Sequence, residues 1–445
     1  MSRTGLAALV LALPLAFACQ YTAQDIEEWK ATRKGPGKIV AVLQAEKYPV
    51  ELRVRAAMAL IEMNREDVQP LRELGRAFQR ITVEDRVPLI SAMVPQIEAA
   101  LRAPATERGP SPVQVRAKDA AFLLLDFSTG AERVRLEDAL LSWLTADLNN
   151  RWMTGENSAD KIVRQVGARA ARALVATMTP DQAAIVQVAG LIKEVGDAEA
   201  KAAASTQLVQ VATAQAGLPR GVREPTLEAM MMIGGRPIVE WALALALVPP
   251  PAEEAARRQF AQVQVFAIRA IKQHILPTDL DRLFAIATNA SLPSDLRDEG
   301  FERISDLRTP DAVPKLWPLL ESDDERVRWR AGDLILSSGG PSVVRELLTK
   351  LPAGRTEYPE RETGSYVDAI AAMNPVPLDQ VRPLLVAESW ISRYLAVRVV
   401  ALRGSRQDVP ILQQLVGDRT RIPGREPAVS IGDEARRAVE RLQGG

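Results

Sequence analysis

Aliphatic residues recur at helical spacing in a short phrase that appears several times along the 445-residue chain. An aliphatic residue, often followed by Arg, precedes a small residue four positions on and aliphatic residues seven or eight positions on. These offsets place the side chains on one face of an α-helix. The clearest copies are LRVRAAMAL at 52–60, VRAKDAAFL at 115–123, VGARAARAL at 166–174 and VRWRAGDLI at 327–335, and weaker copies are LRDEGFERI at 296–304 and SRYLAVRVV at 392–400.

Each of these amphipathic helices is predicted to have a partner helix ahead of it. Turn and capping residues precede the copies, as Asp295 and Asp324 do, and a carboxylate there can accept hydrogen bonds from the first free amides of a helix. Further apolar segments with proline or glycine nearby stand in front of these turns, at 38–44, 312–320 and 378–386. The repeating unit is therefore a pair of helices.

The register of the phrase gives a period. Ile304 and Ile335 hold equivalent positions 31 residues apart, and Arg328 and Arg393 lie 65 apart, close to two periods. Helix pairs at about 30–45 residues are typical of α-solenoids. The pattern resembles the HEAT-repeat family, which implies an all-α superhelical solenoid and a bond along the stack between Asp324 and Arg328. Tetratricopeptide repeats fit less well, because their fixed period and Trp/Gly/Tyr signature are missing.

Two sets of HEAT-like repeats are predicted, at 36–216 and 226–445. The break GLPRGVREP at Gly217–Pro225 separates them. It is equally well explained as a long loop within one continuous solenoid. The phrase blurs at 181–214 and 226–273, although the composition there still favours helices.

The start of the chain resembles a secretory signal peptide. Arg3 precedes an uncharged run at 5–17 that is too short to span a bilayer. Ala18 then precedes Cys19, the only cysteine, a placement that resembles the lipobox of bacterial lipoproteins. That resemblance implies a signal peptide at 1–18, acylation of Cys19 and a lipid-anchored tether at 19–35 that leads into the repeats.

The lipobox match departs from the usual pattern at two positions, where this chain has Ala16 and Phe17. The run Ala16–Ala18 also fits the A-x-A rule of ordinary signal cleavage, which would leave a soluble secreted or periplasmic protein. Gln20 is not the Asp that retains lipoproteins in the inner membrane of enteric bacteria. We therefore expect an outer-membrane lipoprotein that faces the periplasm.

Composition argues against some classes of function. The chain has 56 basic and 56 acidic residues, and a surface that tracks phosphates would show a basic excess, so no nucleic-acid partner is expected. The only histidine is His274, and neither a catalytic arrangement nor a usual zinc ligand set can be assembled around it. We expect a helix-end residue at this position, with no metal and no cofactor. An enzyme that uses carboxylates and His274 is the less favoured alternative.

Large aromatic residues beside arginines are the candidate protein-binding sites, because Trp, Tyr and Arg dominate interface hot spots. Trp329 lies off the apolar face of its helix beside Arg330, and the 65-residue shift places Tyr394, with Arg393, at the equivalent position. The alternative for these rings is packing against an adjacent repeat. Trp152 in NNRWMTGEN and Tyr358 in the polar segment 352–364 are further candidates.

The sequence thus predicts a non-enzymatic, lipid-anchored HEAT-repeat scaffold that binds a protein partner at the bacterial cell envelope. The partner's identity does not follow from the sequence. Recognition of a glycan or cell-wall strand by the aromatic residues is the second alternative.

Overall fold

The computed structural model describes residues 21–65, 67–104, 106, 109–218, 221–352, 360–424 and 428–444, with the side chains of 360–363 excepted. The predicted signal peptide and Cys19 lie outside these residues. The chain divides into two compact units, Met1–Gln207 and Leu208–Gly445. This division falls within helix α12 (Ala198–Ala216), close to the predicted break.

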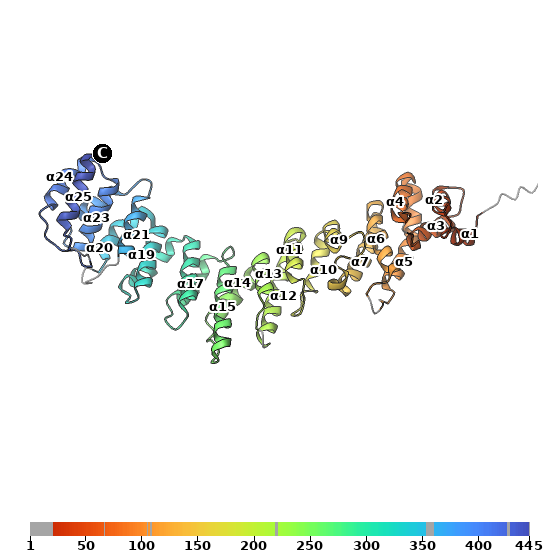
Figure 1. Ribbon diagram of the computed structural model, residues 1–445, viewed down its shortest axis with the longest axis horizontal. Helices are drawn as coiled ribbons and strands as arrows, with labels where there is room; N and C mark the ends of the chain where they lie inside the picture. The colour runs from red at the N-terminus through yellow and green to blue at the C-terminus, as the bar shows by residue number, and fades with distance from the viewer. Residues whose placement is uncertain are drawn as a thin grey trace, which may run out of the picture. The chain divides into compact units, whose positions relative to one another are not determined.

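The first unit is a succession of helices that pack on their neighbours in chain order (Figure 1). Helix α2 packs on α3, α3 on α5 and α6, α5 on α7, and α10 on α11. The helices that precede α12 are α1 (Ala23–Trp29), α2 (Gly35–Gln44), α3 (Val50–Glu62), α4 (Pro70–Arg80), α5 (Val83–Arg102), α6 (Pro112–Leu124), α7 (Gly130–Ala146), α8 (Leu148–Arg151), α9 (Ala159–Val166), α10 (Ala168–Val175) and α11 (Ile185–Val195).

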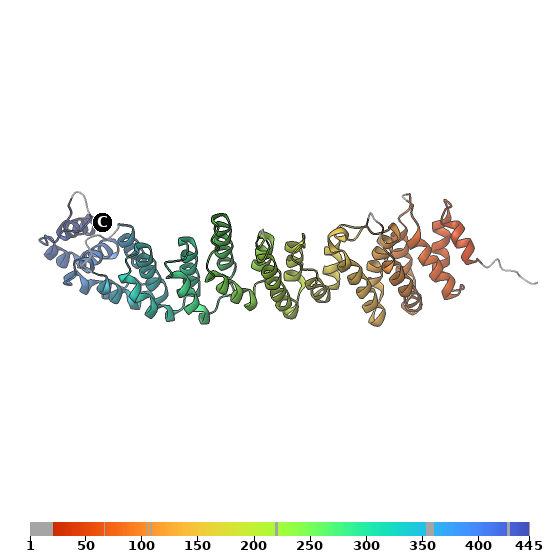
Figure 2. The same cartoon turned by 90° about the horizontal axis from the view of Figure 1, so that it is seen from below.

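In the second unit the helices alternate between two rows (Figure 2). One row holds α13, α15, α17, α19, α21, α23 and α25, each packed on the next, and among the helices between them α14 packs on α16 and α20 on α22. Their bounds are α13 (Glu224–Ile233), α14 (Arg236–Ala246), α15 (Glu254–Ala270), α16 (Leu280–Ala287), α17 (Ser294–Leu307), α18 (Val313–Leu316), α19 (Glu325–Gly339), α20 (Val344–Lys350), α21 (Glu360–Ala371), α22 (Leu378–Val381), α23 (Trp390–Arg403), α24 (Val409–Leu415) and α25 (Ile431–Gly444).

This arrangement confirms the predicted all-α solenoid of HEAT-like helix pairs. The described residues contain no strand, only the isolated bridges Thr106–Gly109 and Arg421–Ser430. Within the described residues, no helix combines the length and apolarity needed to cross a membrane.

The recurring phrase lies within a helix in five of its six copies, those in α3, α6, α17, α19 and α23. In α19 the predicted inward residues are buried, with Ala331 and Ile335 fully so. The copy at 166–174 differs, because Gly167 has a φ of 73° that ends α9 and separates it from α10. A positive φ is easily adopted by glycine and lies outside the right-handed helical region.

Ion pairs connect consecutive repeats, although the predicted pair of Asp324 with Arg328 is wrong. Asp324 caps α19 by accepting from the amide of Arg326, and its second oxygen lies 3.0 Å from Nη1 of Arg297 in α17. Arg328 instead donates to the backbone carbonyls of Ser322 and Asp323. The carboxylate therefore bonds to the phrase arginine of the preceding repeat rather than to that of its own.

A second inter-repeat pair, Arg382 with Asp408, predicts a pH dependence. Nε of Arg382 lies 2.6 Å from Oδ1 of Asp408, and this bond holds the pKa of the largely buried carboxyl below its ordinary 3.8. A carboxyl whose pKa is lower in the folded than in the unfolded state stabilises the fold above the unfolded-state pKa, and this contribution is lost as the pH falls through the folded-state value.

We therefore expect Arg382→Gln to lower the free energy of unfolding at neutral pH and to have a progressively smaller effect as the pH falls below 3.8. Urea unfolding curves measured across that range check this expectation. A loss that stays constant from neutral to acid pH would contradict the role of this ion pair.

Candidate functional site

Trp329 and Arg330, the residues of the predicted anchor, lie side by side on helix α19. Trp329 is partly exposed, and the guanidinium carbon of Arg330 lies 4.7 Å from the centre of its ring. Nη1 of Arg330 lies 2.8 Å from Oε1 of Glu302 in α17. The cation and the ring thus form one patch that spans two consecutive repeats.

Tyr394 does not extend this patch, because its ring is only 2% exposed. Helix α23 buries a wide face that includes four consecutive residues at 394–397, since both α21 and α25 pack against it. Arg393 bonds internally to Oδ2 of Asp418 at 3.1 Å and to the carbonyl of Ala387 at 2.6 Å. The prediction that Tyr394 contacts a partner at the position equivalent to Trp329 is therefore wrong. Tyr394 instead packs in the core, which was the alternative for this ring.

The two other candidates have different outcomes. Tyr358 lies outside the described residues. Trp152 follows α8, is partly exposed and begins a loop that is fastened to helix α6. Nζ of the fully buried Lys118 donates to the carbonyls of Thr154 (2.7 Å) and Asn157 (2.6 Å), which fixes the path of this loop.

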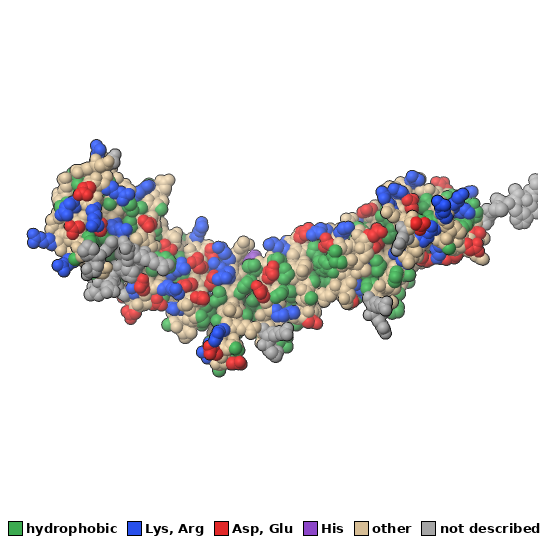
Figure 3. Space-filling view, viewed as in Figure 1, with side chains coloured by type: hydrophobic (Ala, Val, Ile, Leu, Met, Phe, Trp, Pro, Cys, Tyr) green, Lys and Arg blue, Asp and Glu red, His purple; other side chains and the backbone are tan. Residues whose placement is uncertain are grey.

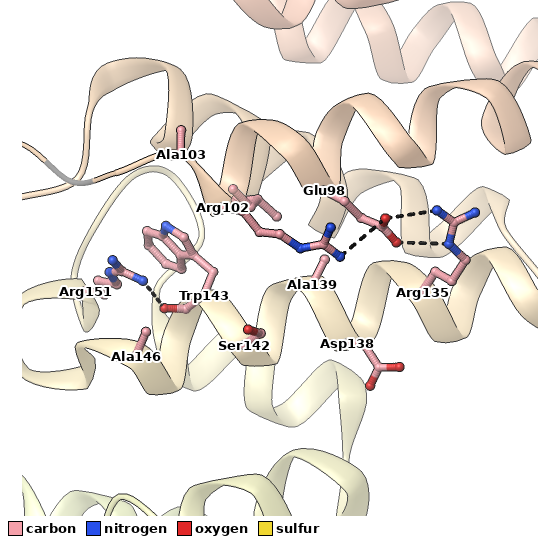
Figure 4. A pocket seen from close by; sticks show the side chains of 11 residues that line it. Glu98, Arg102, Ala103, Arg135, Asp138, Ala139, Ser142, Trp143, Ala146 and Arg151 are labelled. Atoms are coloured by element: carbon pink, nitrogen blue, oxygen red, sulfur yellow. Dashed lines mark hydrogen bonds and ion pairs between the residues drawn. The ribbon is translucent and has the colours of Figure 1, made fainter.

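A cleft of about 450 Å³ lies beside this loop in the first unit (Figure 4). It is formed by the last turns of α5, by α7 and by α8. Its polar wall consists of three arginines, two carboxylates, one hydroxyl and an indole: Arg102, Arg135, Arg151, Glu98, Asp138, Ser142 and Trp143.

Ion pairs neutralise the carboxylates of the cleft. Glu98 accepts from Nε and Nη2 of Arg135, both at 2.9 Å, and these bonds hold the pKa of its carboxyl below the ordinary value. Arg102 lies on the other side of Glu98 at 3.5 Å and is 75% exposed. Asp138 is paired with Arg169 from α10. The charge left over in the cleft is therefore positive.

The side chains of Trp143 and Arg151 lie against each other in the cleft (Figure 4). The guanidinium of Arg151 stacks at 4.9 Å on the ring of Trp143 and donates through Nη1 to that residue's backbone carbonyl. Indole Nε1 of Trp143 and Nε of Arg151 are buried and have no hydrogen-bond acceptor among the described residues. The two side chains are only 3% and 9% exposed.

Sequence reasoning missed this cleft. Its residues come from three helices between positions 98 and 151 and belong to no copy of the phrase. The sequence offers one signal, the pair Arg151–Trp152, in which the tryptophan is the predicted candidate but the arginine is the residue that lines the cleft.

His274 follows α15 in the turn that ends this helix, as expected. Its imidazole lies against Gly234, where an added Cβ would overlap the ring. Within the described ranges, no group of three or more His, Cys, Asp and Glu side chains could hold a metal. Basic and acidic side chains are interleaved over the face shown in Figure 3.

No family model and no curated protein sequence matches the chain. Solved structures of karyopherins do match. Kap121p bound to the extreme C-terminus of the protein phosphatase Cdc14p is 12% identical over 93% of this chain and 46% of that chain, with a TM-score of 0.28. Kap95p with RanGDP is 12% identical over 94% of this chain and 66% of that chain, with a TM-score of 0.23. The chain thus spans about half the length of Kap121p, and a likeness at this level says nothing of its partners.

Proposed function

We propose that this protein is a non-enzymatic scaffold that binds a protein partner at the bacterial cell envelope, to which it is anchored by lipid on Cys19. The observation that carries the binding role is the stacking of consecutive helix pairs, since solenoids bind partners along surfaces to which several repeats contribute. The Trp329–Arg330 patch and the cleft at Trp143 are two such surfaces. Both are built from arginine and indole groups.

The chemistry of these groups favours binding over proton transfer. Arginine stays protonated in proteins and an indole nitrogen only donates, so neither serves as a general base. Both residue types are enriched among the residues that carry most of the binding energy at protein interfaces. The surfaces on both units therefore suit recognition of a partner.

Site-specific photo-crosslinking in living cells tests the scaffold. A photoreactive residue would replace Trp329 or the exposed Ser142, with position 258 as a control on an exposed part of α15. We expect one protein to be captured from positions 329 or 142 and not from 258. Equal capture from all three positions, or none from 329 and 142, would contradict a specific binding surface.

The envelope anchor is the second part of the proposal. It is supported by the apolar run at 5–17 and by the position of Cys19 directly after it. The lipid would hold the repeats at the outer membrane, facing the periplasm. Cleavage after Ala18 without acylation is the alternative, and it would leave the same scaffold soluble in the periplasm.

We expect Cys19→Ser to move the protein from the membrane fraction to the soluble periplasmic fraction, because the anchored thiol is lost. Fractionation of cells with immunodetection measures the shift, and the Ser142→Ala variant is the control that should stay with membranes. Mass spectrometry of the mature amino terminus should show acyl chains on Cys19. A Cys19→Ser protein that still partitions with membranes would rule out this anchor.

A further inference from the structure

We infer that the cleft between α5, α7 and α8 binds an acidic segment of the partner protein, with one carboxylate held by Trp143 and Arg151 and a second held by Arg102. This inference rests on the proposed scaffold function and adds the chemistry of the partner. Three features of the cleft carry it: two unpartnered donors, its charge, and its shape.

The unpartnered donors call for an acceptor from outside the described protein. A buried donor without an acceptor costs about 1–3 kcal/mol, so such groups are rare in folded proteins. Here two of them, Nε1 of Trp143 and Nε of Arg151, belong to side chains that both line the cleft and that contact each other, with the guanidinium carbon 4.9 Å from the ring centre. An ionised carboxylate has two oxygens that only accept, so one such group can serve both donors.

The charge of the cleft selects an anion rather than a neutral acceptor. Glu98 is already held by Arg135, and Asp138 by Arg169, so neither opposes a second carboxylate. Arg151 has no carboxylate partner among the described residues, and hydrogen bonds between guanidinium and carboxylate groups are among the strongest in proteins. A neutral amide at this place would gain less.

Arg102 gives the cleft a second point for an acidic group. Its side chain is 75% exposed, and its Nη2 lies 3.5 Å from Oε2 of Glu98, farther than the 2.9 Å bonds of Arg135 to the same carboxylate. It can therefore turn toward a ligand without leaving Glu98 unpaired. Figure 4 shows Arg102 on the far side of Trp143 from Arg151, which separates the two binding points along the cleft.

The shape and lining of the cleft fit a peptide segment better than a small anion. Its volume of about 450 Å³ is in the range of pockets that enclose drug-sized ligands. Leu101, Ala139 and Ala146 line it beside the indole. These apolar groups can pack against the side-chain methylenes and backbone of a segment that carries two acidic residues.

Binding of synthetic peptides to the full chain in detergent tests the inference. The probe is a fluorescein-labelled peptide in which Glu alternates with Ala, and its comparison is the same peptide with Gln in place of Glu. Both have blocked ends, which removes the terminal carboxylate. We expect the Glu peptide to bind, the Gln peptide to bind at least about tenfold more weakly, and the affinity for the Glu peptide to fall with added salt.

Variants assign the binding to the cleft. Arg102→Ala should weaken binding of the Glu peptide roughly tenfold, and Trp143→Phe, which keeps a ring but removes the donor, about fivefold. Arg258→Ala is a matched control, because Arg258 is 74% exposed and pairs with a glutamate four residues before it, as Arg102 does. Circular dichroism checks that each variant is folded.

Three results would overturn the inference: equal binding of the Glu and Gln peptides, equal weakening by Arg102→Ala and Arg258→Ala, or displacement of the Glu peptide by an equal concentration of inorganic phosphate or of purified cell-wall glycan. Crosslinking separates this outcome from failure of the scaffold. A partner captured from position 329 but not from 142, or a captured segment without Asp or Glu, refutes the acidic-segment site and leaves the scaffold standing. Capture from neither position refutes the scaffold itself.

Discussion

Replacing Asp119 with alanine is expected to lower the free energy of unfolding of the first unit by about 3–5 kcal/mol, because it leaves a buried ammonium group without its counter-ion. Lys118 is fully buried and Asp119 is 3% exposed, and Nζ of Lys118 lies 2.5 Å from Oδ1 of Asp119. Burial lowers the pKa of Lys118. The carboxylate also accepts from the backbone amides of Glu156 and Asn157, both at 3.0 Å.

The loss of Asp119 therefore also removes the acceptor of two backbone amides in the loop that begins at Trp152, although Lys118 can still donate to the carbonyls of this loop. Unfolding in urea, followed by circular dichroism, measures the change. The double variant Lys118→Met/Asp119→Leu should recover only part of the stability, because it removes the unpaired charge but leaves the loop amides and carbonyls that this pair bonds without partners. Glu254→Ala, which breaks an exposed pair with Arg258, is the control and should change stability little. Similar losses in Asp119→Ala and Glu254→Ala would refute a structural role for the buried pair.

The sequence predicts features that depend on residues close together in the chain, and it misses features that depend on contacts between distant residues. The apolar face of α19 depends on the helical period alone, so Val327, Ala331 and Ile335 are predicted correctly. Helix pairing also follows, because turns and caps are local signals. In contrast, the fraction of a helix surface that neighbouring helices bury depends on residues far away in the sequence. Trp329 and Tyr394 occupy equivalent positions, yet only the second is buried.

The sequence does not predict which residues form the contacts between repeats. Asp324 bonds to Arg297, which precedes it by 27 residues, rather than to the nearby Arg328. The cleft depends in the same way on Glu98, Arg135 and Arg151, which come from three helices. A period identifies equivalent residues in successive repeats, but it does not tell which of them meet.

Gly332 lies at such a contact between repeats. Its replacement by alanine is expected to lower the free energy of unfolding of the second unit by about 1–3 kcal/mol. The residue lies within α19, where alanine would ordinarily favour the helix by up to about 1 kcal/mol. A Cβ at Gly332 would, however, lie less than 3.0 Å from the hydroxyl and ring of Tyr366 in α21. Tyr366 is fully buried and its hydroxyl donates to the carbonyl of Arg328 at 3.2 Å, so a shift of the ring away from the new Cβ would weaken this bond and disturb its packing.

Gly364→Ala is the matched control for this prediction, since Gly364 lies within α21 of the same unit and a Cβ there meets no atom of the described part of the chain within 4 Å. The same substitution should therefore destabilise at position 332 and stabilise at position 364, as measured by urea unfolding of both variants. Truncating the tyrosine in Gly332→Ala/Tyr366→Leu should make the alanine less costly than it is beside Tyr366. If both alanines raise stability, helix propensity outweighs the contact between repeats. If the signs are opposite, close packing of α19 against α21 determines which small residue the phrase can hold at this position.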